Sequence, residues 1–359
     1  MIAARGAAGS FADQPFGRML ADLTMARQHL SNQFESIGRV YLAALFGIDN
    51  NKDLVLVAVL PRRLKEKRTM KLCRYDDDRL GVVIGDQVHD VTEAQTEIRA
   101  ATPFTAKVDP VVAALPQWRE RLEKMAASAP AKPLSQVKLL SPVAKPPKIL
   151  AAPTNYAKHV EEMQKFREVM PGLARFSPDI EKAGIFLKSN TSLVGPSEGI
   201  PLRFPDRRND HEAELVVIIG KQGSDIPREK AWDYIAGYSL GLDMTARGAE
   251  DRSFRKSIDG YTVLGPWMIT PDELPNPADV PFTLHVNDEK RQDSNTSFLI
   301  FDIPRLIEFA SQFYTLYPGD VYYTGTPEGV GPVKPGDWVR MNSLPQLGEL
   351  KIQVRAHDK

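Results

Sequence analysis

Two glutamates precede an unbroken apolar run in the stretch Asp210-His211-Glu212-Ala213-Glu214-Leu215-Val216-Val217-Ile218-Ile219-Gly220. The apolar run predicts a strand. Side chains two apart in a strand project from the same face, so Glu212 and Glu214 are expected to point together. Two neighbouring carboxylates repel each other unless a cation lies between them, and hard divalent ions such as Mg²⁺ prefer oxygen ligands. The stretch therefore predicts a divalent-metal site at the head of a strand, although a salt-bridged strand edge explains the pair alone equally well.

A third acidic residue strengthens the metal hypothesis. The run from Tyr238 to Asp243 has the pattern of a buried strand that ends in an acid, where a ligand can face a cleft. Glu212, Glu214 and Asp243 would form a three-carboxylate site with positions left open for substrate. His211 is expected to point away from Glu212 by strand alternation, as a core histidine or a support for the site rather than a ligand.

A histidine and a glutamate lie three residues apart in a second segment, Thr154-Asn155-Tyr156-Ala157-Lys158-His159-Val160-Glu161-Glu162. Thr154 or Asn155 can cap a helix that begins here, which would bring His159 and Glu162 into contact. A carboxylate bonded to one ring nitrogen fixes the tautomer and raises the basicity of the other. This pair suits a general base that acts on water, whereas without further context it would be an ordinary surface pair.

Cations and a glycine-rich loop complete the candidate site. Arg247 and Lys256 are candidates to hold an anionic substrate or an oxyanion, although the charged segment between them resembles a solvated loop. The loop 323–331 lacks the Gly-Lys-Ser/Thr ending of a phosphate loop. We interpret it as a backbone-lined wall of a substrate pocket.

Composition limits the function classes. The chain has 359 residues, with 46 basic and 46 acidic side chains, and can bury a full core. A net charge of zero argues against a nucleic-acid partner, and the basic run 62–68 is interpreted as a solvated linker. The single Cys73 excludes an internal disulfide. No apolar stretch reaches the length of a membrane helix, and no targeting leader is recognised. We therefore expect a soluble, cytoplasmic protein with no membrane partner.

Pattern changes along the chain predict its organisation. Alternating apolar runs separated by turns predict a mixed, mainly β (α+β) fold, with helices near 156–169, 228–235 and 303–313. Met70 opens a hairpin with a turn at Gly85-Asp86, and prolines accumulate before Ile149. The expected divisions are a non-native or poorly ordered extension (1–69), a small N-terminal domain rich in β structure (70–135), a Pro-rich linker (136–148) and a catalytic domain (149–359).

Several of these segments, in this order, resemble the fumarylacetoacetate hydrolase family over about residues 70–357. The similar segments are Asn155-Tyr156-Ala157-Lys158-His159, Phe186-Leu187-Lys188, His211-Glu212-Ala213-Glu214, Asp243-Met244-Thr245-Ala246-Arg247, Lys256-Ser257, Leu264-Gly265-Pro266-Trp267, Arg291-Gln292-Asp293-Ser294-Asn295-Thr296 and Thr324-Gly325-Thr326-Pro327.

The resemblance implies a β-roll with a barrel-like core behind a small N-terminal domain, and a homodimer. It implies Mg²⁺ or Mn²⁺, with Ca²⁺ as a further candidate, held by Glu212, Glu214 and Asp243. It also implies catalytic roles for His159 and Glu162 on a lid helix and for Arg247 and Lys256, and substrate contacts at Tyr156, Lys188 and Thr326.

Some positions depart from the family pattern. Gly248 and Glu250 stand where Asp and Gln are common, and Phe298 occupies a place often held by Asp. The segment 164–182 is long for a lid, which suggests an altered entrance. These changes remove no candidate ligand, but they leave the substrate open.

The hypothesis that follows is a divalent-metal-dependent hydrolase that cleaves a C–C bond in a small anionic 2-oxo acid. An acylpyruvate or fumarylpyruvate would react through a metal-bound enolate, after His159 activates water. The alternatives are an oxaloacetate-type decarboxylase, an isomerase or hydratase of unsaturated 2-oxo acids in aromatic catabolism, and a catalytically silent binding paralogue.

Overall fold

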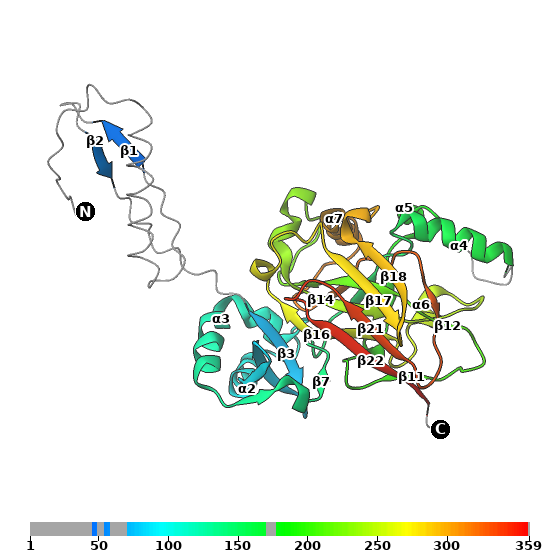
Figure 1. Cartoon of the computed structure of the whole chain (residues 1–359), viewed down its shortest axis with the longest axis horizontal. Coiled ribbons are helices and arrows are strands. Elements are labelled where there is room, and N and C mark those ends of the chain that lie inside the picture. Colours follow the sequence, from blue (N-terminus) through cyan, green and yellow to red (C-terminus); the bar gives the residue numbers. More distant parts are fainter. Residues whose placement is uncertain (1–44, 49–53, 58–69, 170–176, 358–359) are drawn as a thin grey trace, which may run out of the picture. The chain divides into compact units, whose positions relative to one another are not determined.

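A computed structural model describes residues 45–48, 54–57, 70–169 and 177–357 (Figure 1). Contacts divide the chain into two units, Met1–Arg68 and Thr69–Lys359. In the first unit, β1 (Leu45–Ile48) pairs antiparallel with β2 (Leu54–Val57). The expectation that 1–69 form a poorly ordered or non-native extension otherwise lies outside the described residues.

The second unit begins with the expected hairpin. Strand β3 (Lys71–Tyr75) pairs with β4 (Arg79–Ile84), which pairs with β5 (Gln87–Asp90). Gly85 adopts a φ of 61° in the turn, a conformation that glycine enters without steric cost. Helices α2 (Thr92–Ala101) and α3 (Pro110–Ser128) follow. Asp109 caps α3 by accepting hydrogen bonds from two backbone amides of its first turn, which fixes where this helix begins.

One large sheet runs from these first strands to the candidate site. Its order is β6 (Ala131–Pro133), β5, β4, β3, β16 (Thr262–Ile269), β14 (Ile235–Asp243), β13 (Ala213–Ile219), β19 (Val321–Tyr323), β8 (Ile149–Ala151) and β9 (Phe186–Lys188), with β10 (Leu193–Val194) on β16 and β7 (Leu139–Leu140) on β3. Strand β7 lies inside the expected linker, and the β3–β16 ladder crosses the expected domain division. The segment 136–148 therefore contributes to the sheet, and the domain boundaries themselves stay predictions.

The second unit contains a five-stranded and a three-stranded sheet besides the large one. The first has the order β11 (Ile200–Leu202), β22 (Glu349–Ala356), β21 (Trp338–Asn342), β17 (Pro281–Val286) and β18 (Glu289–Asn295). These strands lie together in yellow to red in Figure 1, apart from the green β11. The second joins β15 (Thr245–Ala246), β12 (Asn209–His211) and β20 (Gly331–Pro332).

Burial follows position in these layers. Every residue of β13 is buried, as expected for a central strand with both faces covered, whereas β22 alternates between buried and exposed side chains. Leu215 and Leu240 of the large sheet share one core cluster with Leu284 and Ile352 of the five-stranded sheet. The core thus fixes the head of β13, where the glutamates lie.

Helices are few, and three lie where the sequence predicts them. These are α4 (Ala157–Val169), the 3₁₀ helix η4 (Arg228–Tyr234) and α7 (Ile303–Phe313). Figure 1 shows α4 at the end of this unit away from α2 and α3. The remaining short helices are α5 (Ile180–Ala183), α6 (Arg252–Lys256), η2 (Leu134–Gln136), η3 (Asn190–Ser192), η5 (Pro271–Glu273) and η6 (Thr296–Phe298). The predicted mixed, strand-rich fold is confirmed. None of the helices in the described part of the chain combines the length and apolar character needed to span a bilayer.

Candidate active site

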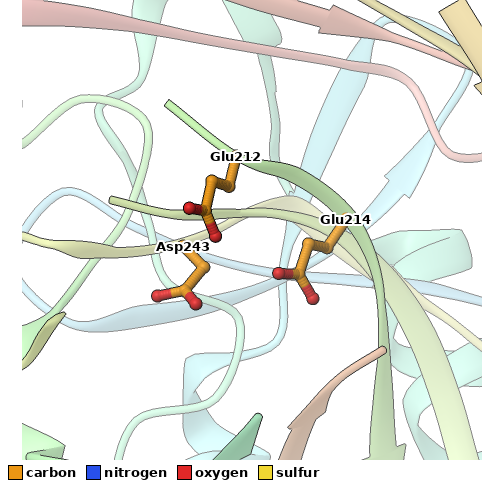
Figure 2. A group of neighbouring side chains, drawn as sticks. All are labelled: Glu212, Glu214 and Asp243. Carbon is orange, nitrogen blue, oxygen red and sulfur yellow. The ribbon is translucent and has the colours of Figure 1, made fainter. Parts of the chain in front are cut away.

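The three predicted carboxylates meet at the head of β13. Glu212 and Glu214 flank Ala213, and β14 ends at Asp243, whose amide donates to the Glu212 carbonyl at 2.9 Å. One carboxylate oxygen from each residue lies within 4.8 Å of the others, and all three side chains are buried. Figure 2 shows the two glutamates on one continuous segment, at and just before the start of β13, and Asp243 on the neighbouring strand, with the carboxylates gathered in one place. Strand pairing therefore produces the cluster that the sequence predicts.

Two buried lysines contact this cluster. The Lys256 Nζ donates to Glu212 Oε2 and to Asp243 Oδ2, both at 2.7 Å. Lys188 forms an ion pair with Asp243 and donates to the Tyr261 carbonyl at 2.8 Å. Burial lowers the pKa of Lys188, although Asp243 opposes this shift. Both lysines thus balance carboxylate charge within the site.

Arg247 connects the cluster to a further acid, Asp210. Its Nη2 lies 3.1 Å from Glu212 Oε1, and its Nε donates to Asp210 Oδ2 at 2.7 Å. The Thr245 hydroxyl also donates to Glu212 Oε1, at 3.0 Å. Burial of Glu212 alone would raise its pKa, but Lys256 and Arg247 outweigh burial and lower the pKa below its ordinary range. Glu212 is therefore held ionised.

Glu214 has a different environment. In the described part of the chain its carboxylate forms no ion pair, and its Oε2 accepts a hydrogen bond from the Gly325 amide at 2.5 Å. Burial, followed by the nearby Asp243, raises the pKa of Glu214 well above its usual range. A buried carboxylate without a cation is costly, and a divalent ion placed among the three acids would supply the missing charge. The donor set of three carboxylate oxygens thus fits a hard divalent metal.

The predicted histidine–glutamate pair lies on α4 beside the same pocket. His159 Nδ1 is 2.9 Å from Glu162 Oε2, and Glu162 Oε1 accepts from the Gly329 amide at 2.9 Å. His159 is 4% exposed and lines the pocket together with Glu212, Glu214 and Asp243. The glycine-rich loop therefore orients Glu162, and Glu162 orients the imidazole.

The residues before α4 have other roles than the expected cap. The Asn155 side chain donates to the carbonyls of Phe301 and Thr324 at 2.9 and 2.8 Å, and it accepts from the Phe301 amide. Thr154 instead donates weakly to the Ser177 carbonyl at 3.4 Å. The cap prediction is wrong: α4 begins at Ala157, and the side chains of Thr154 and Asn155 bond to distant segments of the chain.

The three residues predicted to contact substrate lie in different environments. Thr326 lines the pocket. Lys188 bonds to Asp243, as described above. Tyr156 is 2% exposed and belongs to the main core, and its hydroxyl has no hydrogen-bond partner among the described residues. Burial, followed by Glu214, raises the Tyr156 pKa, so the phenol stays protonated. The substrate-binding roles of these residues stay predictions.

Of the residues after Arg247 that differ from the family pattern, Glu250 forms an ion pair with Arg207, and Gly248 lies against this pair. Arg207 Nη2 lies 2.7 Å from Glu250 Oε2. A Cβ added at Gly248 would lie 1.9 Å from Arg207 Nη2, so glycine leaves room for this ion pair. The carboxylate of Glu250 is thus paired with Arg207. Phe298, the third residue that differs from the family pattern, is 64% exposed. Part of the long lid segment, 170–176, lies outside the described residues.

The sequence model of the family described as "Fumarylacetoacetate (FAA) hydrolase C-terminal" matches residues 148–355, more than half of the chain.

The chain belongs to the fumarylacetoacetate hydrolase family.

Relatives within this family are close. A maleylpyruvate hydrolase from Aquipseudomonas alcaligenes is 49% identical over 287 residues, which cover 80% of this chain and 100% of that protein. The crystal structure of maleylpyruvate hydrolase from Sphingobium sp. SYK-6 in complex with manganese(II) and pyruvate is 38% identical, with a TM-score of 0.68 and coverage of 80% and 100%. A 5-carboxymethyl-2-hydroxymuconate delta-isomerase structure from Mycobacterium smegmatis is 32% identical, with a TM-score of 0.56 and coverage of 81% and 100%. These relatives identify the chain as an enzyme, a hydrolase or a related isomerase.

His211 and Gln292 contact each other next to the glutamate-bearing segment. His211 does not belong to the group of three candidate metal ligands, and it is fully buried. Its Nδ1 lies 3.3 Å from Gln292 Oε1. Burial lowers the pKa of His211 to about 4, so its ring is neutral near pH 7. The Gln292 side chain accepts from the Ala213 amide at 3.0 Å and donates to Thr326 Oγ1 at 2.8 Å. Gln292 thus connects the glutamate strand to the pocket wall.

No role for Gln292 follows from the sequence, because β18 is wholly polar and shows no alternation that would mark one buried side chain.

Replacing Gln292 by leucine is expected to lower kcat/KM by about 10–100-fold, as for loss of outer partners of metal ligands. The unpaired Ala213 amide should also reduce the free energy of unfolding by about 1–3 kcal/mol. Gln292→Glu keeps the acceptor for Ala213 and should lose less stability. Steady-state kinetics and thermal melting measure both effects, with the exposed Gln353→Leu as control. Unchanged kcat/KM in a folded Gln292→Leu enzyme would contradict the assigned link.

Proposed function

We propose that this enzyme hydrolyses a C–C bond in an acylpyruvate of the maleylpyruvate or fumarylpyruvate type. The observation that carries the proposal is one pocket lined by both a buried three-carboxylate cluster and a histidine held by a glutamate. The 49% identity to a maleylpyruvate hydrolase, over the whole of that protein, supports this substrate class.

The metal in this proposal is Mg²⁺ or Mn²⁺, held by Glu212, Glu214 and Asp243. Carboxylate ligands alone do not separate the two ions, and the manganese in the related Sphingobium structure supports Mn²⁺. When bound, the ion polarises the 2-oxo-acid oxygens and stabilises negative charge that develops on them.

His159 acts as the general base. Its Nδ1 is engaged by Glu162, which leaves Nε2 to accept a proton from a water molecule. The water oxygen attacks the keto carbon of the acyl group, and the bond from this carbon to the adjacent CH₂ breaks. The electron pair passes to the pyruvyl fragment as its enolate, which takes a proton on carbon to give pyruvate. The acyl fragment leaves as a carboxylic acid, so one water is consumed for each bond cleaved.

Lys256 and Arg247 stabilise negative charge in this scheme. Both reach Glu212 from buried positions, and both line the pocket with His159. Fixed positive groups in a site of low dielectric stabilise an anionic intermediate without reorganising at the moment of reaction. They are proposed to stabilise the enolate.

Product analysis tests the reaction type. Purified enzyme with Mn²⁺ or Mg²⁺ is mixed with maleylpyruvate, fumarylpyruvate, acetylpyruvate or oxaloacetate, and loss of the enol absorbance is followed. Chromatography should find pyruvate and the matching acid in equal amounts. Release of CO₂ from oxaloacetate alone, or an isomer with an intact carbon skeleton, would instead support the decarboxylase or isomerase alternatives.

Assembly and location belong to the same proposal. The family resemblance supports a homodimer, and the single thiol, Cys73, is compatible with the reducing cytoplasm. Light scattering on the purified full chain measures the assembly directly.

A further inference from the structure

Helix α6 carries two arginines that the reaction scheme does not use. Arg252 and Arg255 lie on the same short helix as Lys256, and all three line the pocket that contains the carboxylate cluster. Asp251 caps the helix by accepting from the Ser253 amide at 2.8 Å, which fixes where this turn begins. Both guanidinium groups are therefore carried by an ordered element at the pocket wall.

Arg255 lacks partners for its buried donors. Its Nε and Nη1 are shut off from solvent and form no hydrogen bond in the described part of the chain. Burial, followed by repulsion from Arg247, lowers the pKa of Arg255. Buried guanidinium donors without acceptors are costly, so an arrangement of this kind indicates an anionic group that is absent from the free protein.

Arg252 is in a similar position. Its guanidinium carbon lies 5.3 Å from the centre of the Phe186 ring, and no acidic side chain pairs with it among the described residues. Burial also lowers the pKa of Arg252. Two cations thus lie three residues apart on one short helix, and neither forms an ion pair among the described residues.

The cations that contact the carboxylate cluster are already matched. Lys256 pairs with Glu212 and Asp243, Lys188 pairs with Asp243, and Arg247 pairs with Glu212 and Asp210. A metal ion would add further positive charge. The two arginines on α6 are therefore available for negative charge brought by the substrate.

We propose that Arg255, assisted by Arg252, binds a second carboxylate at the acyl end of the substrate and makes the enzyme selective for dianionic acylpyruvates. This inference rests on the proposed function. The pyruvyl end of the substrate lies at the carboxylate cluster, and the acyl end reaches α6. The planar guanidinium matches a carboxylate through two parallel hydrogen bonds. A site built around such a bond rejects a substrate without the group, because its donors are left unpaired.

Arg252 and Arg255 also border a second hollow lined by Ala183 and Tyr314. Arginines that served only this hollow would leave substrate preference unchanged. Substrate preference therefore distinguishes the two placements.

The test compares fumarylpyruvate, a dianion, with acetylpyruvate, a monoanion that keeps the same cleavable bond. Wild-type enzyme should prefer fumarylpyruvate in kcat/KM. Arg255→Met should lower kcat/KM for fumarylpyruvate by about 100-fold or more, and lower that for acetylpyruvate by less than about threefold. Arg255→Lys should recover part of the loss, because lysine restores the positive charge but cannot form two parallel hydrogen bonds to a carboxylate. Arg203→Met removes an exposed arginine, paired with Asp259 outside the pocket, and is the matched control.

The outcomes separate this inference from the proposed function. An equal loss for both substrates, or no loss for either, in a folded Arg255→Met enzyme overturns the inference. Equal kcat/KM of the wild-type enzyme for both substrates also overturns it, while hydrolysis of either supports the proposed function. If the wild-type enzyme cleaves neither acylpyruvate, the proposed function itself fails.

Discussion

A Glu214→Gln enzyme is expected to lose turnover and divalent-ion dependence together. Glu214 is the carboxylate of the cluster that has no ion-pair partner among the described residues, so the amide removes charge where the metal needs it most. Loss of outer partners of metal ligands costs about 10–100-fold, so loss of a direct ligand should exceed about 100-fold in kcat/KM. Steady-state kinetics over a Mn²⁺ titration measures both quantities.

Thermal melting provides a readout independent of activity. A metal that binds only the folded protein raises its melting temperature, so Mn²⁺ should stabilise the wild-type enzyme and not Glu214→Gln. Without metal, the variant should be at least as stable as the wild type, because it no longer buries a carboxyl group whose ionised form is disfavoured by burial and by Asp243. Glu349→Gln, which removes an exposed carboxylate on β22, is the control. An active Glu214→Gln enzyme that resists chelators would disprove the metal assignment.

His159→Ala is expected to reduce hydrolysis by about 100- to 10,000-fold, the usual contribution of a general base. The imidazole is nearly fully buried, is oriented by Glu162 and lines the same pocket as the three acids. Its removal therefore takes the proposed base out of the pocket. The loss should fall mainly on kcat, because water activation occurs after substrate binding. Mn²⁺ should still raise the melting temperature of this variant.

The same variant separates hydrolysis from decarboxylation. A decarboxylase that needs only the stabilised enolate would retain much of its rate without a base for water. Glu161→Ala changes an exposed neighbour on α4 and controls for effects on the helix. Near-normal acylpyruvate cleavage by His159→Ala would exclude His159 as the base.

Local patterns account for what the sequence predicts well. The expected helix at 303–313 coincides with α7, because Asp302 caps it and a proline follows at its first turn. Strand alternation places Glu212 and Glu214 together, and an acid at the end of the next strand completes the cluster. These predictions need only spacing along the chain.

Contacts between distant segments account for what it misses. Lys188 and Asp243 are 55 residues apart, and Gln292 and Ala213 are 79 apart, so neither pairing has a local signal. The charged segment from Arg247 to Lys256 resembles a solvated loop in sequence. The structure instead buries both of its end residues, because each pairs with Glu212.

The continuous ladder from β3 through β16 to β14 has a consequence for independent folding. Residues 148–355 carry the family match, but β16 hydrogen-bonds to β3 at Met268–Ile269, and Leu72 shares a core cluster with Ile218 and Leu264. A chain trimmed to the matched region would present an unpaired strand edge beside exposed apolar side chains. Such edges promote aggregation through edge-to-edge pairing between molecules. The first strands of this unit thus protect the sheet that carries Asp243 from self-association.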